Sequence, residues 1–172
     1  IDGSDWYSYG GNDDGEHYSP LTQISDANVA KLGLAWSYDI DTFDAYTAPL
    51  EVNGVVYFAV GHSVIHALDA RTGRLLWQYD PKVAEQPTAE TRLRAGWGIR
   101  GIAYRDGKVF TGTRDGRLIA VDARNGKLLW SVDTLDAEPN GYITGPPFVA
   151  GDNVVIGFGG SDYDTTRGYV TA

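Results

Sequence analysis

The sequence predicts an all-β chain that forms part of a β-propeller, and three observations lead to this fold class. An eleven-residue motif that begins at Ala67 returns at Ala120, 53 positions later. A repeat period near 50 residues is typical of stacked units that cannot bury their apolar faces alone. Each copy contains an Ala-x-Asp-Ala strand end, a Thr-Gly or Asn-Gly turn and a Leu-Leu-Trp strand start, which is the pattern of an antiparallel blade. Glycine also accounts for 22 of the 172 residues, as expected of a protein rich in tight turns.

An N-terminal segment, residues 1–35, is predicted to precede blades that occupy residues 36–172. Ser25 or Asp26 can cap a short helix over residues 27–32, because both side chains accept hydrogen bonds from the first free amides of a helix.

A strand is predicted for residues 34–38, and it contains the first of three tryptophans in similar contexts. Trp36, Trp77 and Trp130 are each followed within two residues by Tyr or Val and then by Asp. Large aromatic side chains dominate the energetics of apolar cores. We therefore interpret the three tryptophans as packing between neighbouring blades rather than as ligand contacts.

Each of the first two repeats is predicted to open with a β-hairpin. Residues 49–58 contain an Asn-Gly dipeptide, and residues 102–111 contain Asp-Gly at the same offset. These dipeptides between apolar runs are the strongest short-range hairpin signal, since both turn residues need positive φ. A third unit opens the same way over residues 147–157 and continues into a strand over residues 167–172.

The number of repeats predicts that the chain is part of something larger. A propeller closes with four to eight blades, whereas this sequence contains two full motifs and part of a third. We expect residues 1–172 to be the N-terminal part of a single propeller domain, about its first two to three blades, with the last one truncated. The remaining blades of the same propeller are then its first partners.

Composition excludes several classes of partner and site. The formal net charge of −9 argues against nucleic acid, which demands a basic face. No run of 18 apolar residues is present, so no membrane span is predicted. The absence of cysteine excludes a disulfide, a thiolate metal site and a C-x-x-C-H haem attachment within these residues. No signal peptide pattern precedes the repeats.

The order of several motifs resembles the opening of the pyrroloquinoline quinone (PQQ) dependent alcohol dehydrogenases. The motifs that carry the resemblance are residues 5–11, 18–24 and 28–32 with Trp36, followed by residues 144–147 and 167–172. The resemblance covers essentially the whole chain. These quinoproteins are periplasmic eight-bladed propellers with a tryptophan-docking motif in each blade.

The resemblance implies an oxidoreductase that oxidises an alcohol substrate with PQQ and Ca²⁺, the cation acting as a Lewis acid. It also implies an electron acceptor such as a cytochrome and a periplasmic location. The family's general base and further metal ligands lie in later blades. The chain by itself is therefore expected to be inactive.

The resemblance also implies a set of site residues. Arg100 precedes a glycine as the family's cofactor-binding arginine does, and its planar fork suits a carboxylate or quinone oxygen. The family places a carboxylate metal ligand 18 residues after a cofactor-binding threonine. Here Thr144 lies 18 residues before Asp162, which replaces the family's glutamate. The backbone expected to approach the cofactor ring belongs to Gly159, Gly160 and Ser161.

Two departures from the family pattern fall on the predicted site. Arg94 and Ala95 stand where the family has adjacent cysteines, so Trp97 or the aliphatic stem of Arg94 would have to cover the cofactor instead. Tyr46 stands where the family has a glutamate, and it supplies a hydrogen bond but no anion. Two interpretations remain open: a divergent branch that binds PQQ, and a chain whose cofactor site has decayed.

A different class of function is also compatible with the repeats. A noncatalytic propeller could use similar blades as a protein-binding scaffold in the cell envelope, like outer-membrane assembly scaffolds. Arg100, Thr144 and Asp162 favour the enzyme, and the departures favour the scaffold.

Other metal-binding candidates are weaker. The three histidines, His17, His62 and His66, lack helical metal-ligand spacing and are interpreted as ordinary histidines. Residues 13–16 lack the alternating acidic pattern of a calcium loop and are interpreted as a solvated loop.

Overall fold

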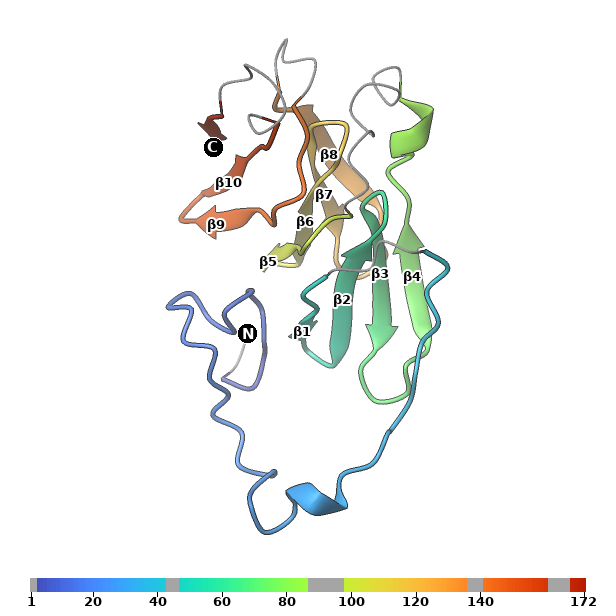
Figure 1. The fold of residues 1–172 in the computed structure, drawn as a ribbon, viewed down its shortest axis with the longest axis vertical. Helices are drawn as coiled ribbons and strands as arrows, with labels where there is room; N and C mark the ends of the chain where they lie inside the picture. Colours follow the sequence, from blue (N-terminus) through green and yellow to red (C-terminus); the bar gives the residue numbers. More distant parts are fainter. Residues whose placement is uncertain (1–2, 43–46, 87–97, 136–140, 161–167) are drawn as a thin grey trace.

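The described part of the protein contains two four-stranded antiparallel sheets and one three-stranded sheet (Figure 1). The computed structural model describes residues 3–42, 47–86, 98–135, 141–160 and 168–172. The sheets correspond to the three predicted repeat units, and we name them blades 1, 2 and 3 in chain order. The all-β fold class is thereby confirmed.

Blade 1 contains four strands in sequential order. Its strands are β1 (Leu50–Val52), β2 (Val55–Val60), β3 (Val64–Asp69) and β4 (Leu75–Tyr79). The predicted hairpin closes at Asn53 and Gly54, whose φ angles are +53° and +76°. Positive φ at both positions is the turn geometry that matches the right-handed twist of the flanking strands.

Blade 2 repeats this arrangement. Its strands are β5 (Ala103–Arg105), β6 (Lys108–Gly112), β7 (Arg117–Asp122) and β8 (Leu128–Asp133). The repetition extends to an irregularity: the pairing register shifts between Ala67 and Leu68 in blade 1 and between Ala120 and Val121 in blade 2. These shifts lie 53 positions apart, like the sequence motif that surrounds them.

Blade 3 contains three strands in the described residues. They are β9 (Phe148–Ala150), β10 (Asn153–Gly157) and β11 (Val170–Thr171), and β10 lies in the middle. The predicted strand near the end of the sequence is confirmed by β11, which pairs with β10 through Ile156 and Thr171.

The tryptophan interpretation is confirmed for two of the three residues. Trp36 Nε1 donates a hydrogen bond to Ala70 O at 3.0 Å, and Trp77 Nε1 donates to Ala123 O at 2.9 Å. Each indole therefore joins the turn after the third strand of the following blade. Trp130 packs against Phe110 of its own blade, with ring centroids 5.9 Å apart, in a cluster that Val149 and Val154 of blade 3 also contact.

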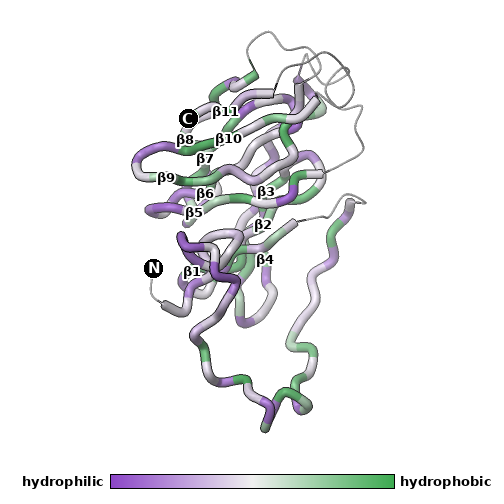
Figure 2. The backbone as a smooth tube through the Cα atoms, turned by 60° about the vertical axis from the view of Figure 1, so that its left-hand side comes forward, coloured by the Kyte–Doolittle hydropathy of each residue, from purple (hydrophilic) through white to green (hydrophobic). Residues whose placement is uncertain are grey.

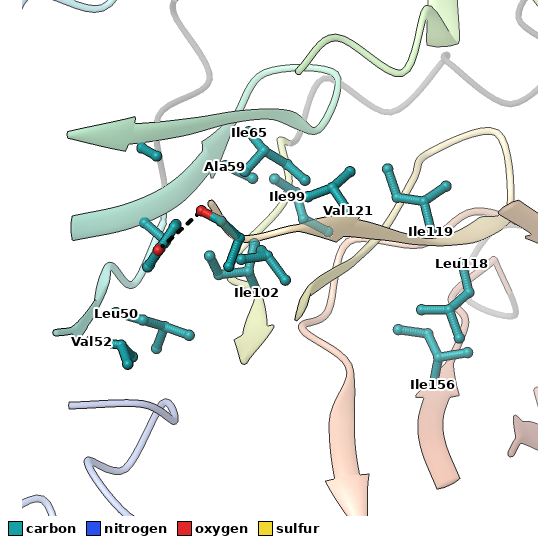
Figure 3. Packing of buried hydrophobic residues seen from close by; sticks show 14 of the residues in the cluster. Leu50, Val52, Ala59, Ile65, Ile99, Ile102, Leu118, Ile119, Val121 and Ile156 are labelled. Atoms are coloured by element: carbon teal, nitrogen blue, oxygen red, sulfur yellow. Dashed lines mark hydrogen bonds between the residues drawn. The ribbon is translucent and has the colours of Figure 1, made fainter. Parts of the chain in front are cut away.

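A shared hydrophobic cluster holds the blades together (Figure 3). Ile65 and Ala59 of blade 1 approach Ile99 and Val121, which lie before and within blade 2, and Ile156 extends the cluster into blade 3. The opposite face of β2 carries Phe58 and Val60, which lie in a second cluster with Trp36, Tyr38 and Ile40 from the chain that precedes blade 1. Because successive residues of a strand point to opposite faces, a strand buried on both faces is apolar throughout.

The N-terminal segment differs from its prediction at the helix. The structure contains a three-residue 3₁₀ helix, η1 (Val29–Lys31), and no α-helix over residues 27–32. Asn28 occupies the cap position in place of Ser25 or Asp26. Its side chain accepts a hydrogen bond from Ser25 N at 2.8 Å and donates one to Gln23 O at 2.7 Å. Those local bonds favour a turn over a longer helix.

The predicted strand at residues 34–38 is wrong as well, since no described strand pairs with it. Trp36, Tyr38 and Ile40 are nevertheless half-buried, whereas their sequence neighbours are exposed. The segment therefore has the alternating burial of a strand without its hydrogen-bonded ladder. Figure 2 shows apolar stretches along this N-terminal segment as well as along the sheets, and Leu34 is 86 % exposed. The predicted division at residues 35 and 36 stays a prediction.

The antiparallel register gives the blades two distinct ends. One end, which we call the turn end, carries the hairpin turns at residues 53–54, 106–107 and 151–152 and the turns at 70–74 and 123–127. The other, which we call the loop end, carries the connections between blades, including the 3₁₀ helix η2 (Val83–Glu85).

Candidate functional site

The main chain at the loop end joins two of the predicted site residues directly. Ala48 N donates a hydrogen bond to Arg100 O at 3.1 Å, and Arg100 N donates to Thr144 O at 2.8 Å. These three residues lie just before the first strand of blades 1, 2 and 3. The structure therefore brings Arg100 and Thr144 together although they are 44 positions apart in the sequence.

Gly159 lies beside the same segment. Its amide donates to Tyr142 O at 2.9 Å, and Tyr142 N donates to Gly159 O at 3.2 Å. A side chain at Gly159 would place its Cβ 3.2 Å from the Tyr142 ring, so glycine allows this close approach. Gly160 is buried and adopts φ +129°, which L side chains rarely adopt. Gly159 therefore lies beside Tyr142, two residues before Thr144.

The chemistry of this group suits an anionic, flat ligand. Arg100 is exposed, and Thr144 is 9 % exposed at the edge of a hollow of about 450 Å³. The hollow is also lined by backbone and side chains of residues 145–146, 157–159 and 168–170. A guanidinium can bind a carboxylate in bidentate fashion, a hydroxyl can add a donor, and glycine leaves a ring room to approach the main chain.

Several predicted site residues lie outside the described residues. They are Tyr46, Trp97, Ser161 and Asp162, together with the departure positions Arg94 and Ala95. Their proposed roles stay predictions, as do the binding roles of Arg100, Thr144, Gly159 and Gly160.

Sequence reasoning did not single out Tyr142, which pairs with Gly159. The pairing is an isolated bridge outside the named strands. No repeat motif or periodicity marks such a bridge in a sequence, so no signal could have found it.

Histidines and acidic residues at other positions have structural partners. Asp13 accepts a charged hydrogen bond from Arg105 Nη2 at 2.9 Å. His66 is buried, with its ring stacked on Phe58 at 5.1 Å and in edge contact with Tyr38 at 5.9 Å. Burial lowers the pKa of His66 below its usual value. Within the described ranges, no group of three or more His, Cys, Asp or Glu residues could hold a metal ion.

In the part of the chain that the structure describes, no helix combines the length and the apolar character needed to cross a membrane.

Comparison with protein families identifies relatives of the whole chain. Residues 6–172 match the family model described as the PQQ glucose/ethanol/alcohol dehydrogenase β-propeller domain. A 1-butanol dehydrogenase (cytochrome c) from Thauera butanivorans is 45 % identical over 99 % of this chain. The match covers 24 % of that relative, so this chain spans about a quarter of its length.

Solved structures agree with the sequence comparison. The quinohemoprotein alcohol dehydrogenase ADHIIG from Pseudomonas putida superposes with a TM-score of 0.88 at 45 % identity, covering 98 % of this chain and 25 % of that one. A europium-containing methanol dehydrogenase superposes with a TM-score of 0.86 at 32 % identity, covering 98 % and 30 %. The likeness therefore extends from sequence motifs to backbone geometry.

Proposed function

The chain belongs to the PQQ-dependent alcohol dehydrogenase family, and we propose that the full-length protein oxidises an alcohol with PQQ and a bound divalent cation. The observation that carries the proposal is the direct main-chain bond between Arg100 and Thr144, with Gly159 paired to Tyr142 two residues before Thr144. This bond joins connections of two blades at the loop end, and both of its residues are ones that the family resemblance assigns to the cofactor.

The described residues fit the chemistry of PQQ, a flat tricyclic ortho-quinone with three carboxylates. Arg100 would bind a carboxylate or quinone oxygen, and Thr144 would donate its hydroxyl to a carboxylate. Gly159 and Gly160 would admit the ring close to the main chain. When bound, PQQ supplies the oxidant that takes two electrons from the alcohol.

We propose Ca²⁺ as the metal and Asp162 as one of its ligands, because hard divalent cations select anionic oxygens. Aspartate is one methylene shorter than the family's glutamate, so a single carboxylate oxygen is the expected contact. The proposal includes a periplasmic location and an electron acceptor such as a cytochrome, in line with the cytochrome c named for the Thauera relative. The general base and the remaining metal ligands would come from later blades.

A titration of the full-length apoprotein with PQQ tests the proposal. With Ca²⁺ present, the quinone absorbance should change at micromolar PQQ, and a chelator should abolish the change. The noncatalytic scaffold hypothesis predicts no calcium-dependent change at all. A repeat with Eu³⁺ determines whether the site distinguishes calcium from the ion named for the methanol dehydrogenase relative.

Variants of Asp162 separate a metal ligand from a turn residue. As a ligand, Asp162→Glu should keep or tighten calcium binding and Asp162→Asn should weaken it by about tenfold or more. If Asp162 only shapes the glycine-rich turn, Asp162→Asn should leave calcium affinity unchanged, since an amide stabilises turns about as well as a carboxylate.

A further inference from the structure

We propose that a buried hydrogen-bonded network around the β6–β7 turn positions the two segments that carry Arg100 and Gly159. The inference rests on the proposed function, because it concerns how the cofactor-binding segments are held. Its residues are Thr113, Asp115, Arg117, Thr134 and Tyr169, none of which is a predicted cofactor contact.

The centre of the network is a buried carboxylate. The Asp115 side chain is 2 % exposed, and its Oδ2 lies 2.7 Å from both Nε and Nη2 of Arg117. Thr113 donates its hydroxyl to Asp115 Oδ1. A charge removed from water to this degree requires such partners, so the turn is held in one geometry.

The network reaches blade 1 through the same arginine. Arg117 Nη2 also donates to Pro81 O at 2.8 Å. Pro81 directly precedes η2 and its cap residue, and Val83 of η2 is 1 % exposed. The segment of Arg100 is reached through blade 3, because Gly159 pairs with Tyr142 and Thr144 O, two residues later, accepts the amide of Arg100. One planar guanidinium thus joins a carboxylate and a carbonyl, which the point charge of a lysine cannot reproduce.

The network reaches blade 3 through the end of β8. Gly116 O accepts hydrogen bonds from both Thr134 N and Thr134 Oγ1 at 2.9 Å. Thr134 O in turn accepts a hydrogen bond from the Tyr169 hydroxyl at 3.0 Å. The Tyr169 ring contacts Phe158 edge-on, with centroids 4.4 Å apart, and Phe158 directly precedes Gly159.

Blade 1 shows that a blade folds without this network. The residues 53 positions before Thr113, Asp115 and Arg117 are Val60, His62 and Val64. They cannot form a carboxylate–guanidinium pair, yet β2 and β3 pair over their full length. The charged turn therefore adds a function that the repeat itself does not need. It lies at the loop end, and Gly112, which precedes it, lies against Ile143, the residue before Thr144.

The decisive variants are Arg117→Lys and Tyr169→Phe in the full-length apoprotein. Arg117→Lys keeps the charge and loses the fork, and Tyr169→Phe removes one hydroxyl. The matched control is Arg124→Lys at the turn end, where Arg124 Nη2 lies 2.8 Å from Asp122 Oδ2 with the same two-residue separation.

Amide hydrogen exchange measures positioning without the cofactor. The amides of Arg100 and Gly159, which donate to Thr144 O and Tyr142 O, should exchange about tenfold faster in Arg117→Lys and about threefold faster in Tyr169→Phe. They should be unchanged in Arg124→Lys. Unchanged exchange rates at both amides would overturn the proposal. An equal increase of the exchange rates throughout β5–β8 would overturn it as well, because that result indicates a general loss of structure in blade 2. If Arg117→Lys fails to fold, Tyr169→Phe decides.

The dissociation constant of PQQ gives the second measurement. This dissociation constant should rise about tenfold in Arg117→Lys, which is a typical effect of changing a residue that orients the residues in contact with a ligand. It should stay constant in Arg124→Lys. Equal affinity of wild type and Arg117→Lys overturns the proposal. If the wild-type protein binds no PQQ, the proposed function fails, and the exchange measurement alone decides whether the network positions these segments.

Discussion

The two ends of the blades differ in how closely they follow the sequence repeat. At the turn end, blade 1 and blade 2 use the same chemistry at equivalent positions. At the loop end, the two blades carry different residues with different interactions. The repeated features of the turn end are those that a blade needs in order to pack against its neighbour. The features of the loop end are specific to each blade and are available for binding.

The main-chain geometry of the turn end is repeated in blades 1 and 2. Gly73 and Gly126 both adopt φ +70°, and both lie under a tryptophan from the preceding repeat. The main-chain carbonyls of Asp69 and Asp122 each accept a hydrogen bond from the amide of the glycine four residues later, at 2.9 and 2.8 Å. Selection for docking of neighbouring blades explains this uniformity, because every blade must bury the same faces.

The loop end shows no such uniformity. The β2–β3 turn of blade 1 contains Gly61 and His62, whereas the β6–β7 turn of blade 2 contains the buried carboxylate of Asp115, which is paired with Arg117 at the start of β7. The segments that carry Arg100 and Thr144 lie at this end too. A rigid repeated scaffold with variable connections is a common arrangement for binding sites.

The largest expected effect tests the docking at the turn end. In Gly126→Ala, the new Cβ would lie 2.5 Å from Trp77 Cε3, and φ +70° disfavours any L side chain. Strain and displacement of the indole together should destabilise the full-length protein by about 3 kcal/mol or more. The thermal unfolding midpoint measures the loss.

Gly54→Ala is the matched control for that variant. Gly54 adopts φ +76°, and no atom lies within 4 Å of the position that the new Cβ would take. Backbone strain alone should cost about 1 kcal/mol. Equal midpoints for the two alanine variants would show that indole docking does not limit stability, and the distinction between the two ends would lose its energetic basis.

The repeat made most of the fold predictable from sequence. The Asn-Gly and Asp-Gly hairpins and the Leu-Leu-Trp strand starts depend on local turn chemistry, which a sequence displays directly. Residues 34–38 were wrong as a strand because a ladder requires a partner strand, which local composition cannot supply. The helix over residues 27–32 was wrong because the Asn28 side chain bonds the neighbouring main chain.

The site was less predictable than the fold. Arg100 and Thr144 were grouped by the family resemblance, and the structure places them in direct main-chain contact. The Arg117–Pro81 contact was not predicted. It depends on how two blades meet in space, and neither residue lies within the eleven-residue motif.

A smaller effect concerns a tyrosine that joins the two blades near the turn end. Tyr57 is 5 % exposed, and its hydroxyl donates to Ala123 O at 3.2 Å. Burial, with further contributions from Tyr104 and two carboxylates, raises the pKa of Tyr57 to about 12. The unfolded chain ionises near pH 10, so the stabilisation by the neutral hydroxyl is complete below pH 10 and declines as the pH rises towards 12.

Tyr57→Phe should lower stability at pH 7 by about 1 kcal/mol, because Ala123 O retains the bond from Trp77 Nε1. Between pH 9 and pH 11, the unfolding midpoint of this variant should also fall less than the midpoint of the wild-type protein. Tyr18→Phe, at a position 72 % exposed, should change neither quantity. An alkaline decrease that is as steep in Tyr57→Phe as in wild type would contradict the assignment.

The smallest expected effect lies on the face of blade 1 that the N-terminal segment covers. His66 packs between Phe58 and Tyr38 beside a cavity of about 420 Å³, which His62, Asp80 and Lys82 also line. Because burial lowers the pKa of His66 in the folded protein, its contribution to stability is complete above the unfolded value near 6.5 and is lost as the pH falls below it.

Protonation of His66 should detach residues 36–40 first, because the charged ring would have to leave its apolar neighbours. The protection of the amides of these residues, corrected for the intrinsic pH dependence of exchange, should therefore decrease between pH 7.5 and pH 5.5, by a free energy of less than about 1 kcal/mol. The pH dependence should be reduced in His66→Gln and retained in His17→Gln, whose side chain is exposed in the N-terminal segment. If both variants retain it equally, the other ionisable groups of the cavity control the docking, and the loop end of blade 1 carries no histidine-dependent contact.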